Sequence, residues 1–535
     1  MNNLILNDVS LRESGQVEGG MMNPSDQIRY VQYLLEGGIN RIEIGFPGSS
    51  EEQKRQCQRI AEHVHKWDGT KPNLSGLARA HKNDILAVKE AGCDMCHIYI
   101  PASDELMLAQ FHAEKYGTTK DEKRKRITET AKEAIVFAKS LGFAHIEYSP
   151  EDAARAGKEF LSFLVQEVVE VGADIVNIPD TTGLRIGSEF GDLIAYLFAN
   201  VADINRSTIS VHCHNDSDHS THNALQAVLA GARQVEGAFY GLGERSGMTK
   251  FEALLMNINT RRDIFKNVET DFDKSVCVKI VNFVGQVLGM PVPRHWVVAG
   301  SQNGIVSSGT HQAIEARAEE QGKESPYYSW NPGEYGHKGV EVVVTQSSGK
   351  AGLKKRLEKL GYNVSDIQLA KISERVKQIS EAKSGTALKD VELTAIVQEA
   401  ITEIPFPIMI KRCQTTGGKG TIPSATVVLE ADSRIFTDIA TGDGPFDAVM
   451  KAVKSAIGKA YPEVKEAQIS LVHWHASALT PGTNAVADAY AQIKVVNGGD
   501  RIFSGKGADP DTIQASAQAF ANCFSWYLAS INQAD

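Results

Sequence analysis

The sequence predicts an α/β protein whose N-terminal half is a (β/α)8 TIM barrel. Through residue 240, short apolar strands alternate with longer amphipathic helical segments, and this alternation indicates a parallel sheet. The pattern repeats eight times, and about 250 residues is the usual size of a closed barrel of this kind. An open doubly wound sheet is the alternative, but it would separate the first strand from the last ones. The residues with metal-binding chemistry follow the first strand and the late strands, and a shared metal needs them close together. We therefore favour the barrel.

Each predicted strand is a short apolar run bounded by turn residues. The strands are expected near residues 3–8, 40–46, 73–77, 94–100, 144–148, 174–178, 208–214 and 234–239. Between them, apolar residues recur at helical spacing, as in 24–36, 51–66, 82–91, 120–141 and 161–171.

The remainder of the chain divides into two further regions. We assign residues 1–260 to the barrel, 261–395 to a charged, helical linker subdomain, and 396–535 to a separate C-terminal α/β domain. In this last region we expect strands at 421–429, 468–475 and 489–496, and helices at 446–460 and 511–531.

The composition is typical of a globular enzyme of a reducing compartment. Hydrophobic residues make up 42% of the chain and charged residues 23%, and the net charge of -10 argues against a nucleic-acid partner. The first residues lack the basic and apolar segments of a signal peptide, and no run approaches the ~20 apolar residues of a membrane span. Seven scattered cysteines fit free thiols, so we expect a cytoplasmic protein.

His212 and His214 are the first candidate metal ligands. They end the seventh predicted strand, and alternation along a strand places both imidazoles on one face. Two imidazoles at the carboxyl end of a strand form half of a divalent-metal site. A His-x-His pair by itself is as well explained by two partly buried, hydrogen-bonded histidines.

Arg12 and Glu13 supply what the histidine pair lacks. They follow the first predicted strand in a segment that we expect to be a loop. An isolated Arg–Glu pair is usually solvated. At the mouth of a barrel, however, Glu13 could complete a carboxylate-plus-two-histidine set that leaves positions open for a bidentate ligand. Arg12 would then face the oxygen of that ligand, and such a site polarises a carbonyl substrate.

Several segments in family order carry a resemblance to known enzymes. These segments are Asp8–Gln16, Ile42–Pro47, Glu147–Asp152, Asn177–Gly183, His212–Asp216, Gly241–Gly247, Gly442–Ala448 and Gly505–Ser516. Through them the chain resembles the 2-isopropylmalate synthase and homocitrate synthase family, metal-dependent TIM-barrel enzymes that condense an acyl-CoA with a 2-oxo acid. The last two segments resemble the leucine-sensing regulatory domain of this family. The resemblance covers nearly the whole chain.

The resemblance implies a role for each candidate residue. Glu13, His212 and His214 match ligands of a divalent metal (Zn, Mn or Mg) that chelates the 2-oxo acid. Arg12 matches a residue that neutralises oxyanion charge, which is most effective in a dry site. Glu151 and His311 match catalytic residues, and His311 is a candidate general base for the methyl group of acetyl-CoA. The matching substrate-binding positions are Glu43, His97, Ser149 and Thr181. Apart from the metal ligands, each has the alternative of a structural role around the site.

Two positions depart from the pattern of the isopropylmalate branch. The isopropylmalate branch has Asp at Glu13 and a metal-binding Asn at Met248, whereas homocitrate synthases resemble this chain at both positions. At Glu147, however, homocitrate synthases have Arg, and a charged Glu there would repel the second carboxylate of their substrate. Two further histidines in Ser217–His222 are also unusual, either as extra ligands or as surface helix residues.

We therefore predict an acetyltransferase that condenses acetyl-CoA with 2-oxoisovalerate in leucine biosynthesis. The alternatives are citramalate, homocitrate or Re-type citrate synthase activity, or a catalytically inactive paralogue that senses an amino acid. The resemblance also implies a homodimer and leucine as effector.

Overall fold

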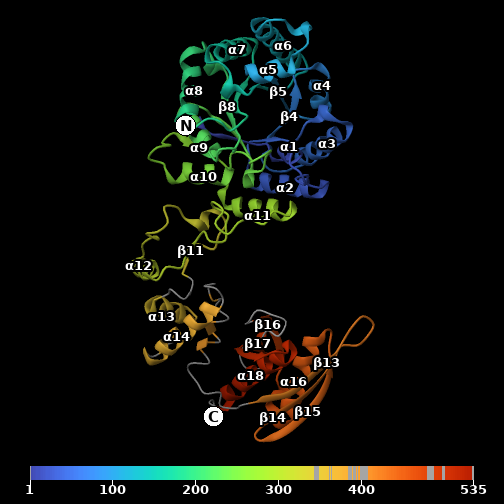
Figure 1. The fold of residues 1–535 in the computed structure, drawn as a ribbon, viewed down its shortest axis with the longest axis vertical. Coiled ribbons are helices and arrows are strands. Elements are labelled where there is room, and N and C mark those ends of the chain that lie inside the picture. The colour runs from blue at the N-terminus through green and yellow to red at the C-terminus, as the bar shows by residue number, and fades with distance from the viewer. Residues whose placement is uncertain are drawn as a thin grey trace. The chain divides into compact units, whose positions relative to one another are not determined.

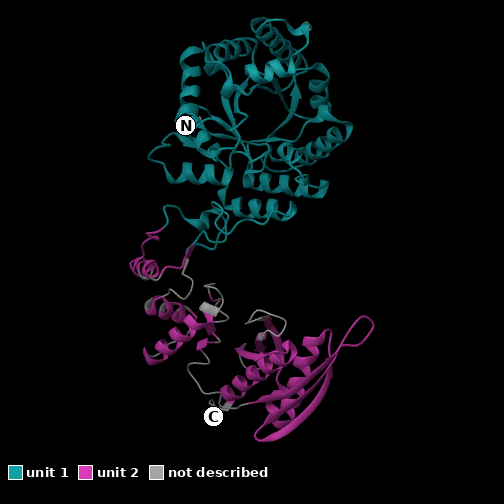
Figure 2. Cartoon of the chain, in the orientation of Figure 1, with its two compact units in different colours: residues 1–304, 328–340 teal, residues 305–327, 341–535 magenta. Residues whose placement is uncertain are grey.

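The computed structural model describes most of the chain in two compact units. The described residues are 2–342, 349–360, 362, 364, 366–382, 388, 393–394, 396–397, 408–478, 487–496 and 501–532. The first unit consists of Met1–Gly304 and Tyr328–Val340 (Figure 2, teal), and the second of Ile305–Tyr327 and Glu341–Asp535 (Figure 2, magenta).

The first unit contains the predicted closed parallel barrel. Its strands follow one another round the ring in chain order from β2 to β9, and β9 pairs with β2 to close it. Figure 1 shows the strands inside a ring of helices. The strands are β2 (Ile5–Asp8), β3 (Arg41–Glu43), β4 (Asn73–Arg79), β5 (Met95–Pro101), β6 (His145–Glu151), β7 (Ile175–Asp180), β8 (Thr208–Cys213) and β9 (Gln234–Gly237). Each overlaps a predicted strand, so the fold class is confirmed.

Several outer helices begin at residues whose side chains cap them. The side chain of Asn23 accepts a hydrogen bond from the amide of Asp26, and Thr119 forms a capping box with Glu122. The helices are α2 (Pro24–Glu36), α3 (Glu51–His65), α4 (Lys82–Glu90), α5 (Asp104–Gln110), α6 (Lys120–Ser140), α7 (Lys158–Val171), α8 (Gly187–Asn200), α9 (Ser220–Leu229), α10 (Phe251–Thr260) and α11 (Cys277–Val287). A two-stranded sheet of β1 (Asn2–Asn3) and β10 (Val268–Glu269) adjoins the barrel.

Alternation along the strands separates an apolar layer from a polar one. One set of buried strand residues is apolar and belongs to the large hydrophobic core with the helices, for example Leu6, Ile98 and Val211. The residues between them are polar and buried, for example Asn7, His97 and His212. Because successive side chains point to opposite faces, these polar groups share the interior of the barrel. The polar interior is where the candidate site lies.

The second unit begins with helices and ends in a domain with antiparallel sheets. Its first described elements are β11 (Ile305–Val306), α12 (Gly309–Glu320), β12 (Glu341–Val342), α13 (Lys350–Lys359) and α14 (Asp366–Ala382). The C-terminal part has two three-stranded sheets and three helices: β13 (Met409–Thr416), β14 (Ser424–Ala431), β15 (Arg434–Thr441), α16 (Pro445–Ala460), α17 (Pro462–Glu466), β16 (Ile469–Ala478), β17 (Ala487–Val495), β18 (Arg501–Asp509) and α18 (Thr512–Asn532).

Glycine permits close packing between β18 and α18. A Cβ atom on Gly505 would lie 2.1 Å from the carbonyl oxygen of Ala519, and one on Gly507 would lie 2.1 Å from that of Ala515. Any side chain at these positions would therefore push the helix off the sheet.

Within the described part of the chain, no helix is both long enough and apolar enough to cross a membrane. The described cysteines are free thiols, and Cys93 and Cys96 are buried.

Candidate active site

The three predicted metal ligands lie together at the mouth of the barrel. Glu13, His212 and His214 each offer one ligand atom, and these atoms lie within 4.8 Å of one another. His212 Nε2 is 3.2 Å from His214 Nε2 and 3.8 Å from Glu13 Oε1. All three residues are buried. Because only β9 lies between β2 and β8, the closed barrel brings the end of the first strand close to the end of the seventh, as the prediction required.

The segment that carries Arg12 and Glu13 is a one-turn helix and not the expected loop. Helix α1 (Ser10–Ser14) starts directly after β2. Asp8, at the end of β2, accepts hydrogen bonds from the amide and hydroxyl of Ser10, both at 3.1 Å. This side-chain acceptor competes with the strand and turns the chain into the helix, a local effect that the apolar pattern does not report.

The loop after β9 also contacts the carboxylate of Glu13. The amide of Glu244 donates to Glu13 Oε2 at 3.4 Å, and a Cβ atom on Gly243 would lie 3.3 Å from the same oxygen. A residue larger than glycine would therefore crowd this carboxylate.

The protonation of the two imidazoles fits a divalent metal. Burial lowers the pKa of both His212 and His214 to about 4, so both are neutral at neutral pH, the form that ligates metals. His212 Nδ1 lies 2.7 Å from Glu236 Oε2, and donation to this carboxylate leaves the Nε2 lone pair free. Two imidazoles and one carboxylate are a donor set of divalent transition metals. The residues present therefore fit the metal that the resemblance implies.

Arg12 supplies a fixed positive charge beside these groups. Its NH1 lies 2.7 Å from Glu13 Oε1, and its Nε donates to Glu43 Oε1. Burial lowers the pKa of the guanidinium, but the carboxylates of Glu13 and Glu43 outweigh this effect and raise it. Arg12 is held at two points, so its charge is preorganised.

His97 and Ser149 continue this network across the barrel. His97 Nδ1 lies 2.5 Å from Glu43 Oε2, and its Nε2 lies 2.7 Å from Ser149 Oγ. Burial lowers the pKa of His97, but the carboxylates of Glu43, Glu236 and Glu147 raise it to about 9. Asn177 Nδ2 donates to Ser149 Oγ at 2.9 Å. Because Glu43 contacts both Arg12 and His97, it holds two cationic side chains in place.

Glu151 and Thr181 lie on neighbouring strand ends. Burial, together with the adjacent Asp152, raises the pKa of Glu151, which favours its protonated form more than in water. Thr181 Oγ1 accepts from the amide of Asp152 at 3.0 Å. Asp152 has a left-handed backbone, with φ of 64°. Thr181 therefore supports the turn that follows Glu151.

Glu147 lies deeper in the barrel, in an environment that bears on its charge. The side chain is fully buried and accepts from Gln234 Nε2 at 2.6 Å. Burial raises the pKa of Glu147 to about 8, which favours the protonated form of this carboxyl. A protonated Glu147 would repel a second substrate carboxylate less than a charged one, and the discrimination between oxo acids at this position stays a prediction.

Family models match the chain in three consecutive segments. The HMGL-like model matches residues 3–284, the homocitrate synthase post-HMGL domain-like model residues 308–384, and the LeuA allosteric (dimerisation) domain model residues 387–528. The 2-isopropylmalate synthase of Syntrophus aciditrophicus is 34% identical over 97% of this chain and 95% of its own length. That of Methylacidiphilum infernorum is 33% identical over 97% of this chain and 98% of its own. The chain belongs to the 2-isopropylmalate synthase family.

Among solved structures, the hydroxymethylglutaryl-CoA lyase from Pseudomonas aeruginosa matches with a TM-score of 0.44 and 20% identity, over 54% of this chain and 94% of that one.

Two features of this chain bear on possible further metal ligands. Met248 is buried, and its backbone forms an isolated β-bridge with that of His214, so this neighbour of His214 offers only an apolar side chain. His222 is exposed on α9, and a Cβ atom on Gly187 would lie 2.4 Å from its ring. Neither His219 nor His222 joins a candidate metal group within the described residues.

His311 belongs to the second unit. It is exposed on α12, and its ring stacks on Tyr327 with centroids 4.0 Å apart. Its role at the active site stays a prediction.

Sequence reasoning missed Glu236 and Asn177. Both are buried, and Asn177 Nδ2 lies 3.3 Å from Glu236 Oε2. The sequence did contain a signal: Glu236 is a charged residue within β9, and every residue of this strand is buried. Such a residue is rarely buried without a partner.

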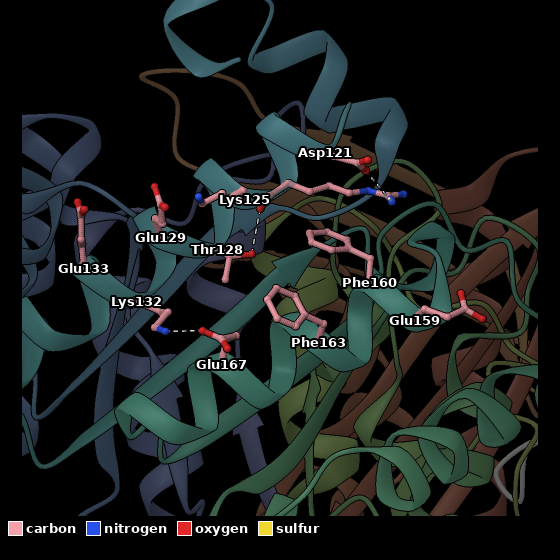
Figure 3. A pocket seen from close by; sticks show the side chains of 11 residues that line it. Asp121, Lys125, Thr128, Glu129, Lys132, Glu133, Glu159, Phe160, Phe163 and Glu167 are labelled. Atoms are coloured by element: carbon pink, nitrogen blue, oxygen red, sulfur yellow. Dashed lines mark hydrogen bonds and ion pairs between the residues drawn. The ribbon is translucent and has the colours of Figure 1, made fainter. Parts of the chain in front are cut away.

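A groove of about 800 Å³ lies away from the strand ends, on α6 and α7 (Figure 3). Phe160 and Phe163 line it, together with the ion pair of Lys132 and Glu167. None of the candidate catalytic or metal-binding residues lines this groove.

Proposed function

We propose that this protein condenses acetyl-CoA with 2-oxoisovalerate to form 2-isopropylmalate and CoA. The observation that carries the proposal is the placement of Arg12 beside Glu13, His212 and His214 at the mouth of the barrel. The full-length similarity to 2-isopropylmalate synthases supports the same reaction.

The proposed reaction uses the side chains in distinct roles. A divalent metal on Glu13, His212 and His214 would supply Lewis acidity toward the keto group of the oxo acid. A base removes a proton from the acetyl methyl group, and for this role we propose His311 of the partner subunit, assisted by Glu151. The methyl carbon then bonds to the keto carbon, and the keto oxygen gains the electron pair and a proton. Arg12 stabilises the negative charge that develops on this oxygen. Water finally cleaves the thioester, which releases CoA and a carboxylate.

The remaining candidates surround this chemistry. We propose that His97, Ser149 and Thr181 bind the oxo acid or support the residues that do, and that Glu43 orients Arg12 and His97. The carboxyl of Glu147 offers no positive charge to a second carboxylate, so a branched monocarboxylate is preferred to 2-oxoglutarate.

The release of CoA thiol by metal-replete protein tests this proposal. We expect release from acetyl-CoA with 2-oxoisovalerate, and much less with pyruvate, oxaloacetate or 2-oxoglutarate. A preference for one of the other acids would retain the condensation and change the substrate. If no acid supports release although metal is bound, the enzymatic proposal fails and the inactive amino-acid sensor is favoured.

We further propose that the C-terminal region pairs two copies of the chain and binds leucine as an inhibitor. The match of residues 387–528 to an allosteric dimerisation domain supports this role. Millimolar leucine is expected to lower the rate of CoA release, and sedimentation is expected to give the mass of two chains. Activity that stays constant across this leucine range would exclude leucine as the effector, and a fully active monomer would contradict the pairing.

A further inference from the structure

We propose that Glu236 is a positioning residue that holds His212 in the tautomer and orientation in which Nε2 binds the metal. This inference rests on the proposed metal site and adds a residue outside the ligand set. Its basis is the hydrogen bond between Glu236 Oε2 and His212 Nδ1, at 2.7 Å, inside the barrel.

Strand register places the two residues directly against each other. Glu236 on β9 is the register partner of His212 on β8, and on its other side it is the partner of Asn7 on β2. The side chain of Glu236 is fully buried. The closed barrel therefore fixes the backbone on both sides of this carboxylate, so its position does not depend on a mobile loop.

Further donors hold the carboxylate in place. Asn7 Nδ2 donates to Oε1 and Asn177 Nδ2 to Oε2, both at 3.3 Å, and His97 Nδ1 lies 3.6 Å from Oε1. When the imidazole of His212 donates from Nδ1 to Oε2, its proton lies on Nδ1. The Nε2 atom then presents a lone pair toward His214 and Glu13.

The position of Glu236 also suggests a second metal site, which the surrounding charges disfavour. Glu43, His97 and Glu236 have ligand atoms within 4.8 Å of one another. However, Arg12 already donates to Glu43, and His97 Nδ1 lies 2.5 Å from the same carboxylate. These cations supply the charge that a metal would bring. We therefore assign Glu236 to the support of His212.

A carboxylate behind a ligating histidine fixes the ring and raises its basicity, and loss of such a partner typically costs 10–100-fold in metal affinity. We expect Glu236→Gln to weaken Zn²⁺ and Mn²⁺ binding by about this factor, measured by competition with a chelator in the absence of substrate. The visible spectrum of the Co²⁺-substituted protein is expected to change, because the geometry at His212 changes. Glu236→Asp, which keeps the charge, is expected to recover part of the affinity.

Glu147→Gln is the matched control. It replaces another fully buried carboxyl of the barrel interior, which accepts a hydrogen bond from Gln234 and not from a candidate metal ligand. We expect this variant to keep wild-type metal affinity. Thermal unfolding of each variant separates a change at the metal from a loss of folded protein.

A double-mutant cycle with His212→Ala tests whether Glu236 acts through this histidine. If it does, Glu236→Gln adds little to the loss already caused by His212→Ala. A folded Glu236→Gln protein with wild-type affinity and an unchanged Co²⁺ spectrum would overturn the inference, as would full additivity in the cycle. Wild-type protein that binds metal but releases no CoA would instead overturn the proposed function alone, and wild-type protein that binds no metal would overturn both.

Discussion

His214→Ala is expected to reduce divalent-metal affinity by more than about 100-fold and to abolish measurable CoA release. Loss of an outer partner of a ligand already costs 10–100-fold, and this substitution removes a ligand itself. His214 is also one of only two imidazoles in the group, and Met248 beside it offers no replacement oxygen or nitrogen. Metal content after dialysis and the rate of CoA release are the measurements.

His222→Ala provides the control for this prediction. His222 is exposed on the neighbouring helix α9 and lies outside the candidate metal groups of the described residues. We expect the His222→Ala protein to keep the metal content and the rate of CoA release of the wild type. A His214→Ala protein that retains one metal ion per chain and normal activity would show that the ion binds elsewhere.

Arg12→Lys is expected to lower kcat by about 10²–10³-fold while the protein still binds metal. Removal of one preorganised donor from an oxyanion site costs this much in other enzymes. Lysine keeps the charge, but it cannot reproduce the two directions in which Arg12 contacts Glu13 and Glu43. Steady-state kinetics with saturating acetyl-CoA and oxo acid, together with metal content, measure the effect.

The matched control is Arg261→Lys. Arg261 also makes a two-point contact, with Asp263 at 2.9 and 2.7 Å, but the pair is exposed beyond the end of α10. We expect the Arg261→Lys enzyme to have near wild-type kinetics. An Arg12→Lys enzyme with unchanged kcat would mean that this guanidinium does not act on the transition state, whereas equal losses in both variants would point to a general effect on folding.

Local patterns predicted the barrel well because its strands are short, largely buried segments that alternate with helical ones. Strand β7, for example, is buried at every residue, and such runs are typical of parallel sheets covered on both faces. The C-terminal sheets were predicted less completely. Strands β13 and β15 have one largely exposed face, and their apolar signal is weak, so only β14 of that sheet was expected. Strand β18 was missed because glycines interrupt its pattern.

Within the candidate site, the sequence by itself determined which residues are candidate ligands and the strand ends that carry them. His212 and His214 share a face because side chains alternate along β8, and Glu13 follows β2 whatever the fold. These statements need only the chemistry of each residue and the period of its strand.

Only the tertiary structure decided the partners and the protonation of these groups. Glu236 faces His212, and the pKa of Glu147 is raised, because closure of the barrel brings distant strands together and excludes water between them. Hydrogen bonds and desolvation depend on neighbours across the sheet, and those neighbours are far apart in the sequence. The candidate ligands could therefore be predicted from the chain, whereas the environment around them was created by the fold.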